Sequence, residues 1–330
     1  MSKKAKFLLI VVDIVLLIAI AVGVFINHSR SSAQDAEIGA SELSRRYAPT
    51  LDGPDGEKAE IRRHLSTVLL IGTDNYAEED DQFEVDLHFN FDMCDYLIVL
   101  VFDHEAKTVT PVQINRDTMC EVFWISVNGI ADGTTEYEQI CSAHTYGPGG
   151  TVSCRNTVKT VSSFLYGVPI DNYFAFTMDA VPIMNDAVGG VTVELAEDLP
   201  VLGKDYVRGA HITLKGPAAL RFVRTRDVED FTSNRDRMAR HRQYMTAFTE
   251  AARSTLASDS NLAMNTFNTL KPYICTDLSV EQFSDMVERL SGYEMLPTLT
   301  YEGEYIEGEF AEFYPDQASL WACVRRAFCS

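Results

Sequence analysis

Positive charge is scarce in this chain of 330 residues. Lysine and arginine number 28 against 48 aspartate and glutamate residues, which gives a formal net charge of −20 at pH 7. A folded domain of this charge repels the phosphate backbone of nucleic acids and anionic surfaces in general. The composition therefore argues against a nucleic-acid partner, and it makes any cluster of arginines a candidate for a specific role.

Several signatures of other protein classes are also missing. The seven cysteines form no Cys-x-x-Cys pair, and no cysteine and histidine cluster has the spacing of a zinc site. We find no internal repeat and no low-complexity tract. Because 46% of the residues are hydrophobic, the chain can build a sizeable core. These features predict a globular domain without a thiolate metal centre.

One long apolar run is present, at residues 7–26, and Asp13 is its single charge. About twenty apolar residues make a helix long enough to cross a bilayer. Lys3, Lys4 and Lys6 precede the run, so the positive-inside tendency leaves residues 1–6 in the cytoplasm and the rest of the chain outside. We expect a retained single-pass transmembrane helix; the alternative is a signal sequence cleaved after Ala33.

Disulfides can form outside the cytoplasm. Cys141 and Cys154 flank a glycine-rich turn and are the pair that the sequence favours, although spacing alone does not fix connectivity. The number of cysteines is odd, so at least one stays unpaired within the chain.

Residues 27–64 are polar and contain Pro49, Gly53, Pro54 and Gly56, which is typical of an extracytoplasmic stalk. A globular pattern follows over residues 65–330. It begins with two continuous apolar runs, at 67–71 and 96–102, of the kind found in strands buried on both faces. Between them, residues 75–92 are acidic and aperiodic, which predicts a long exposed loop.

Strands and helices alternate along the rest of the chain. The patterns predict strands at 108–114, 173–177 and 191–193, and helices at 155–165, 180–187, from Pro217 onward and at 235–256. This alternation indicates an α/β fold, namely a three-layer α/β/α domain with a central mixed sheet.

Two acidic residues stand at ends of the first two predicted strands. Asp74 follows the first, and Asp95 precedes the second. If these strands are antiparallel neighbours, both carboxylates lie at one edge of the sheet and can bind Mg²⁺, which takes a few carboxylates together with phosphate oxygens. The alternative is that each is an ordinary turn or cap residue.

Arginines gather in two places. Arg116 follows the predicted strand at 108–114, where a surface ion pair with Asp117 is the plainer interpretation. Within 22 residues the chain then has seven arginines and no lysine: Arg221, Arg224, Arg226, Arg235, Arg237, Arg240 and Arg242. The planar guanidinium matches phosphate oxygens, whereas a solvated helix face usually mixes in lysine. Neutralisation by nearby acidic residues is the alternative. Carboxylates and arginines together predict a phosphate-handling domain.

The order of the motifs resembles that of the LytR–CpsA–Psr family over roughly residues 65–252. The matching segments are Val68–Asp74, Asp95–Val99, Ile114–Thr118, Tyr146–Gly150, Val168–Tyr173, Val188–Val191, Leu214–Leu220, Val223–Arg226, Arg237 and Arg240–Gln243. The resemblance implies a transferase at the bacterial plasma membrane that moves a glycopolymer of the teichoic acid or capsule type from a polyprenyl-pyrophosphate carrier to peptidoglycan.

The same resemblance implies roles for individual residues. Asp74 and Asp95 would hold Mg²⁺ or Mn²⁺ and act with Arg116 in catalysis. The carrier's pyrophosphate would be bound by Arg116, Arg224, Arg226 and Arg237, with Arg240 and Gln243 in support. The lipid tail would occupy an apolar tunnel, for which Met178, Met184, Phe164 and Phe222 are candidates, although ordinary core is the favoured role for each.

Some positions depart from the family pattern. Met93 stands where an arginine is usual, and Arg62 or Arg63 is a candidate to replace it. Asn115 replaces a common proline, and His241 a common glutamine. Two further functions therefore stay open: hydrolysis of the same pyrophosphate, and binding or sensing of a lipid-linked sugar without catalysis.

Overall fold

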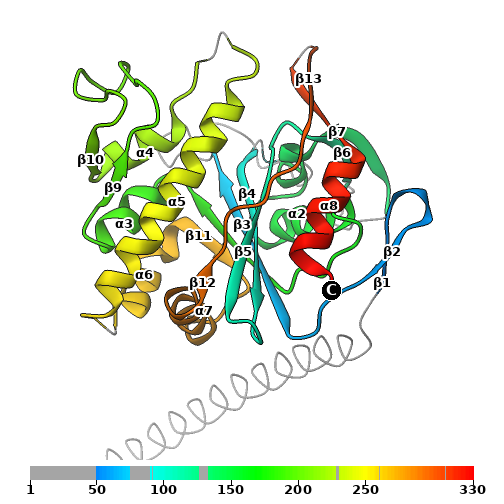
Figure 1. Cartoon of the computed structure of the whole chain (residues 1–330), viewed down its shortest axis with the longest axis horizontal. Coiled ribbons are helices and arrows are strands. Elements are labelled where there is room, and N and C mark those ends of the chain that lie inside the picture. Colours follow the sequence, from blue (N-terminus) through cyan, green and yellow to red (C-terminus); the bar gives the residue numbers. More distant parts are fainter. Residues whose placement is uncertain are drawn as a thin grey trace, which may run out of the picture. The chain divides into compact units, whose positions relative to one another are not determined.

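The computed structural model describes residues 50–74, 90, 92–125, 133–227, 230–259, 261–308 and 310–330. Residues from Thr50 to Ser330 form one compact unit (Figure 1). The predicted transmembrane helix at 7–26 and nearly all of the acidic segment at 75–92 lie outside the described residues. Within the part that is described, no helix is both long enough and apolar enough to cross a bilayer.

A six-stranded mixed sheet forms the centre of this unit, as predicted. Its strand order is β11-β8-β3-β4-β5-β12, where the strands are β3 (Leu65–Thr73), β4 (Cys94–Asp103), β5 (Thr108–Ile114), β8 (Asn172–Thr177), β11 (Ile274–Thr276) and β12 (Glu294–Met295). The β3–β4–β5 meander is antiparallel, β8 runs parallel to β3, and β12 runs parallel to β5. The meander requires only a short turn between β4 and β5, whereas the parallel β3–β8 pair needs the long crossover that contains helix α2 (Gly150–Phe164).

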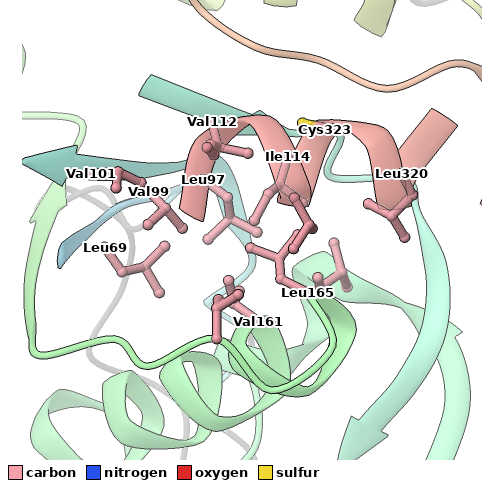
Figure 2. Packing of buried hydrophobic residues seen from close by; sticks show 14 of the residues in the cluster. Leu69, Leu97, Val99, Val101, Val112, Ile114, Val161, Leu165, Leu320 and Cys323 are labelled. Atoms are coloured by element: carbon pink, nitrogen blue, oxygen red, sulfur yellow. The ribbon is translucent and has the colours of Figure 1, made fainter. Parts of the chain in front are cut away.

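The central strands are apolar on both faces because helices cover both. On one face, Leu69, Leu97 and Val99 pack with α2 and α8 (Gln317–Phe328), and Figure 2 shows Val161 and Leu165 meeting these strand residues from below. Alternate residues such as Ile98 and Leu100 point to the opposite face. Continuous apolar runs are the sequence consequence of this two-sided burial.

The opposite face is covered by α3 (Ala180–Ala187), α6 (Leu262–Leu270) and α7 (Val280–Gly292). The longest helix, α5 (Asn234–Leu256), packs beside them (Figure 1). A third apolar cluster joins α5 to α4 (Pro217–Arg224) and to the hairpin of β9 (Val191–Glu194) and β10 (His211–Leu214). The predicted bounds of α3, the start of α4 and nearly the whole of α5 agree with the structure.

Smaller elements complete the unit. They are the hairpins β1 (Thr50–Asp52) with β2 (Lys58–Glu60), β6 (Met119–Phe123) with β7 (Thr135–Gln139), and β13 (Gly303–Glu307) with β14 (Ala311–Pro315), and the short 3-10 helices η1 (Pro54–Gly56), η2 (Ile140–His144) and η3 (Lys271–Tyr273).

The compact unit begins inside the predicted stalk. Leu51 and Ile61 are both buried, and Ile61 forms a bridge with Cys329 near the end of the chain. Gly53 lies so close to the Trp321 ring that a Cβ there would come within 2.4 Å of it. Residues 50–64 therefore belong structurally to the domain, because their few apolar side chains find partners on α8.

Candidate functional site

Asp74 and Asp95 lie at the same edge of the sheet because β3 and β4 are antiparallel. Asp74 directly follows the last residue of β3, and its backbone N–H donates to the Met93 carbonyl at 3.1 Å. The register pairs Gly72 with Tyr96 but Thr73 with Cys94, so Asp95 is the extra residue of a β-bulge. Bulges re-aim side chains at sheet edges. The strand arrangement on which the predicted carboxylate pair depended is therefore present.

Two arginines hold the Asp95 carboxylate. Arg116 Nη1 pairs with Asp95 Oδ1, and Arg237 Nη1 donates to Asp95 Oδ2 at 3.0 Å. Only 13% of the Arg116 side chain, 4% of Arg237 and 19% of Asp95 is exposed. Arg116 comes from the connection after β5, which is the neighbour of β4, whereas Arg237 comes from the first turn of α5. The fold thus brings the two predicted arginine groups together on one predicted carboxylate.

A chain of amide side chains positions Arg237. The Asn234 Oδ1 atom accepts from Arg237 Nε at 3.1 Å and from Nη2 at 2.8 Å. Asn234 Nδ2 in turn donates to Asn115 Oδ1 at 2.8 Å, and Asn115 Nδ2 donates to the Tyr305 hydroxyl at 2.8 Å. Asn115 and Asn234 are buried. Sequence reasoning missed Asn234 and Tyr305; the one signal was Asn115 itself, a polar residue in place of a common proline.

Burial and crowding set the electrostatics of the site. Burial raises the pKa of Asp74; the Arg116 guanidinium opposes this shift, and Asp92 adds to it. Burial also lowers the pKa of Arg237 to about 10, assisted by repulsion from Arg116 and Arg226. Arg237 remains charged at neutral pH, but in an environment where positive charges are close together. Such a cluster attracts an anion and in particular the oxygens of a phosphate group.

An apolar cavity of about 260 Å³ begins at this cluster. Asp95 and Arg237 of the cluster line it, together with Arg224 and with Arg253 from the last turn of α5. Its apolar wall includes Phe174, Phe176, Met178, Met184, Met245 and Phe248. The wall comes from β8, α3 and α5, so the cavity lies between the sheet and the helices on its second face. The arrangement suits an amphiphile with an anionic head and an apolar tail.

The proposed tunnel residues fall into two groups. Met178 and Met184 line the cavity. Phe164 and Phe222 do not. Phe164 packs against Tyr301 on the first face of the sheet, and Phe222 is fully buried in the cluster between α4 and the β9–β10 hairpin. Both have the role of ordinary core that the sequence favoured. Helical spacing indicates which side of a helix is apolar, but not which core that side enters.

Arg224 and Arg226 lie on the exposed side of the site. Arg224 is the last residue of α4 and lines the cavity, whereas Arg226 follows the helix. The charge of Arg226 reaches Asp117 and Arg237, since it contributes to the pKa shift of each.

Arg240 and Gln243 act at a distance from Asp95. Arg240 Nη1 pairs with Glu197 Oε1 at 2.6 Å, and its Nη2 donates to the Thr225 carbonyl. Gln243 Nε2 donates to the Glu194 carbonyl. These contacts hold the segment between Arg224 and Arg226, and the neighbouring hairpin, against α5.

His241 is buried at the cavity wall and donates from Nε2 to the Val223 carbonyl at 2.9 Å. Burial lowers its pKa to about 3, and repulsion from Arg237 contributes. The imidazole is therefore neutral at physiological pH, and with Nε2 engaged it serves as packing for Tyr96, whose ring centroid is 5.2 Å away.

The position before the bulge is occupied by Met93, whose sulfur lies 3.5 Å from Arg116 Nη2. Neither candidate replacement for the missing arginine lies at the site. Arg62 pairs with Asp103 at 2.7 Å and donates to the Ala327 carbonyl at 2.6 Å, at the far end of β4. Arg63 precedes the far end of β3.

The predicted Cys141–Cys154 pair is not brought together. Cys141 Sγ lies 3.4 Å from Arg116 Nη2, whereas Cys154 Sγ lies 3.7 Å from His144 Nε2. All seven cysteines are free thiols in the structure. Among the described residues there is also no group of three or more histidine, cysteine, aspartate or glutamate side chains that could hold a metal ion. A cation here would thus depend on two carboxylates and on ligand oxygens.

Comparison with known proteins places these features in context. A model of the LytR_cpsA_psr family matches residues 29–323. The polyisoprenyl-teichoic acid–peptidoglycan teichoic acid transferase TagU of Bacillus mycoides is 27% identical over 286 residues, which are 86% of this chain and 83% of that protein. The TagU of Bacillus licheniformis is 29% identical over 228 residues, 69% of this chain and 64% of that protein. The crystal structure of B. subtilis TagV has a TM-score of 0.60 at 23% identity, covering 81% of this chain and 97% of that one.

Proposed function

Because this chain belongs to the LytR–CpsA–Psr family, we propose that it is a transferase that moves a glycopolymer from a polyprenyl-pyrophosphate carrier to peptidoglycan. The observation that carries the proposal is the Arg116–Asp95–Arg237 cluster at the mouth of an apolar cavity. The relatives are named teichoic acid transferases, which supports an anionic wall polymer as the glycopolymer that is transferred.

The two parts of the site match the two parts of such a carrier. A polyprenyl chain is apolar and would occupy the cavity between the sheet and α5, in contact with Phe176, Met178 and Met245. The pyrophosphate would lie at the mouth, where Arg237 is buried, Arg116 has a side chain that is 13% exposed, and Arg224 and Arg226 are exposed. Phosphate oxygens would then share the two buried guanidinium groups with Asp95.

A divalent cation fits the remaining polar groups. Asp74 and Asp95 supply the hard oxygen ligands that Mg²⁺ or Mn²⁺ prefers. Partial burial raises the pKa of Asp74, and the charge of Arg116 offsets this shift only in part. When bound, the cation would supply charge neutralisation to Asp74 and to the pyrophosphate.

We infer the following chemistry at the site. A hydroxyl group of a peptidoglycan sugar attacks the phosphorus next to the glycopolymer, and the bond from this phosphorus to the oxygen of the lipid phosphate breaks. Arg116 and Arg237 offset the negative charge that develops on the leaving lipid phosphate. The proton of the attacking hydroxyl passes to Asp74 or Asp95. A raised pKa makes Asp74 a better proton acceptor than an ordinary aspartate.

The membrane is part of the proposal. A retained helix at residues 7–26 would anchor the domain outside the cytoplasm, where both the lipid carrier and peptidoglycan are available. The composition of that segment and the lysines before it support this topology.

The test is a transfer assay with the full chain in detergent micelles, a polyprenyl-pyrophosphate oligosaccharide, Mg²⁺ and peptidoglycan fragments. Arg116→Ala is compared with Arg235→Ala, a matched loss of charge at a residue whose side chain is 74% exposed. Glycan transfer that requires the acceptor and is lost only in Arg116→Ala supports the proposal. Release of the glycan to water without acceptor indicates a hydrolase, and binding without turnover indicates a lipid-linked-sugar binder.

A further inference from the structure

Two cysteines away from the proposed active site face each other across the contact between α2 and the edge strand β11. Cys154 lies in the second turn of α2 and is completely buried. Cys275 is the middle residue of β11, which pairs only with β8 in the sheet, and it is half-buried. The helix packs directly on this strand, so their side chains share one interface.

The neighbours of Cys275 show that its sulfur lies against the N-terminal part of α2. Cys275 Sγ lies 3.8 Å from Thr151 Oγ1 and 4.0 Å from the Tyr173 hydroxyl. Thr151 precedes Cys154 by three residues, so both occupy the same face of α2, and helical side chains lean toward the N-terminus, that is, toward Thr151. The side chain of Cys154, whose Sγ lies 3.7 Å from His144 Nε2, therefore lies on the face of α2 that contacts β11 and Cys275.

The electrostatics of the two thiols reflect the same contact. A hydrogen bond between Cys154 and Cys275 is the largest influence on both pKa values: it raises that of Cys154 and lowers that of Cys275 to about 6. Thr151 and Tyr173 also stabilise the Cys275 thiolate by hydrogen bonds. Cys275 is thus both the more acidic and the more accessible of the two, and these are the properties of an attacking thiol.

We propose that Cys154 and Cys275 form a disulfide bond that fastens edge strand β11 to helix α2. The proposal replaces the Cys141–Cys154 pair favoured by spacing, because Cys141 Sγ is directed at Arg116. It does not depend on the proposed transferase activity, and it requires only that the domain meets an oxidising environment.

The oxidant is an external disulfide, either of a small thiol or of an oxidoreductase. The Cys275 thiolate attacks one sulfur of that disulfide, whose S–S bond breaks and releases a first thiolate. The buried Cys154 thiolate then attacks Cys275 Sγ, forms the new bond and releases the second thiolate. The protein loses two protons and two electrons, and the external disulfide is reduced to two thiols.

The structural consequence is a brace on a short edge strand of the sheet. β11 has three residues and forms the edge beyond β8, which in turn supports β3. An edge strand is held by backbone pairing on one side only. The bond would close a loop of about 120 residues and so restrict the unfolded chain strongly.

Peptide mapping tests the bond directly. The full chain is alkylated under denaturing conditions while still in membranes and is then digested with trypsin without reductant. Cys154 lies in the peptide 117–155 and Cys275 in the peptide 254–289. We expect these two peptides linked in the wild type and in Cys323→Ser, and separate in Cys154→Ser and Cys275→Ser. The Cys154→Ser variant is needed because Cys120 and Cys141 share the first peptide.

Thermal unfolding provides a second readout. Reductant should lower the unfolding temperature of the wild type by roughly 5–10 °C and leave Cys275→Ser unchanged. Recovery of both cysteines in alkylated form from the wild type, or linkage of Cys154 to another cysteine, would overturn the proposal. So would an unfolding temperature that reductant changes equally in the wild type and in Cys275→Ser.

Discussion

Arg116 and Arg237 belong to different layers of the fold, one at the edge of the sheet and one on α5, and both pair with the carboxylate of Asp95. The pairing links the sheet to the helix that forms one wall of the apolar cavity. It also holds two guanidinium groups close together, which would be repulsive without an anion between them. Asp95 thus holds in place the two guanidinium groups that we assign to the phosphates of the lipid carrier.

Replacement of Asp95 tests this relationship in the ligand-free protein. Asp95→Asn leaves Arg237, with only 4% of its side chain exposed, without a carboxylate partner. We expect a loss of roughly 3 kcal/mol in the free energy of unfolding. Added pyrophosphate should recover part of the loss, because it supplies the missing negative charge. Urea unfolding with and without pyrophosphate measures both effects, and a variant as stable as the wild type would contradict the prediction.

Asp74 should make stability depend on pH in the opposite sense to an ion-paired aspartate. Its pKa is raised in the folded protein, so its contribution is favourable below the unfolded pKa and is lost as pH rises through the folded pKa. We therefore expect Asp74→Asn to raise the unfolding temperature at pH 7 in the presence of chelator, with no gain at pH 3. Added Mg²⁺ should stabilise the wild type and not the variant. Calorimetry at the two pH values checks the sign, and a variant that is less stable at pH 7 would refute it.

Asn115 should matter through Arg237, which it positions by way of Asn234. Asn115→Ala leaves a buried amide of Asn234 without its acceptor, which costs roughly 1–3 kcal/mol. We also expect a lower rate of glycan transfer, since Arg237 loses its fixed position. The dependence of that rate on the Mg²⁺ concentration should stay unchanged. Tyr305→Phe removes one hydroxyl from the end of the same network and serves as the milder control. Equal effects of the two changes on activity would argue against the positioning role.

The sequence predicted more of the fold than of the contacts within the site. The central strands were predictable because burial on both faces leaves an unmistakable apolar run, and α3, α4 and α5 because proline and helical periodicity mark their bounds. The family pattern pointed to Asp74, Asp95, Arg116 and Arg237. It did not indicate that one carboxylate would join both arginines, because this contact depends on a β-bulge that a sequence does not display.

Long-range partners account for the remaining errors. Arg62 was a candidate for the site because it is an arginine near the first strand, but its partner Asp103 is fixed only when β4 is laid beside β3. Cys141 and Cys154 are close in sequence and flank a turn, yet the helix that starts at Gly150 carries Cys154 away toward β11. In both cases the prediction relied on closeness in the sequence, whereas the order of the strands and helices sets the actual neighbours.

The cavity should discriminate between long and short lipid chains. Met184 lies on its wall, and Met184→Trp would fill part of the 260 Å³. We expect roughly tenfold weaker binding of a long polyprenyl pyrophosphate and little change for a ten-carbon analogue, whose chain needs less of the cavity. Met264→Trp places the same ring at a residue that is 47% exposed and outside the cavity, and it should bind both as the wild type does. An equal loss of affinity for both chain lengths would contradict the assignment of the cavity to the lipid chain.

The most direct measurement is the affinity of the full chain for polyprenyl pyrophosphate, by calorimetric titration in detergent, for the wild type, Arg237→Ala and Arg235→Ala. Both changes remove one arginine from the same turn of α5, but only Arg237 contacts Asp95. We predict that Arg237→Ala weakens binding roughly 10- to 100-fold, which is the contribution of a charge-assisted pair, and that Arg235→Ala binds as the wild type does. Equal affinities for all three proteins would show that the Arg116–Asp95–Arg237 cluster is not the pyrophosphate site.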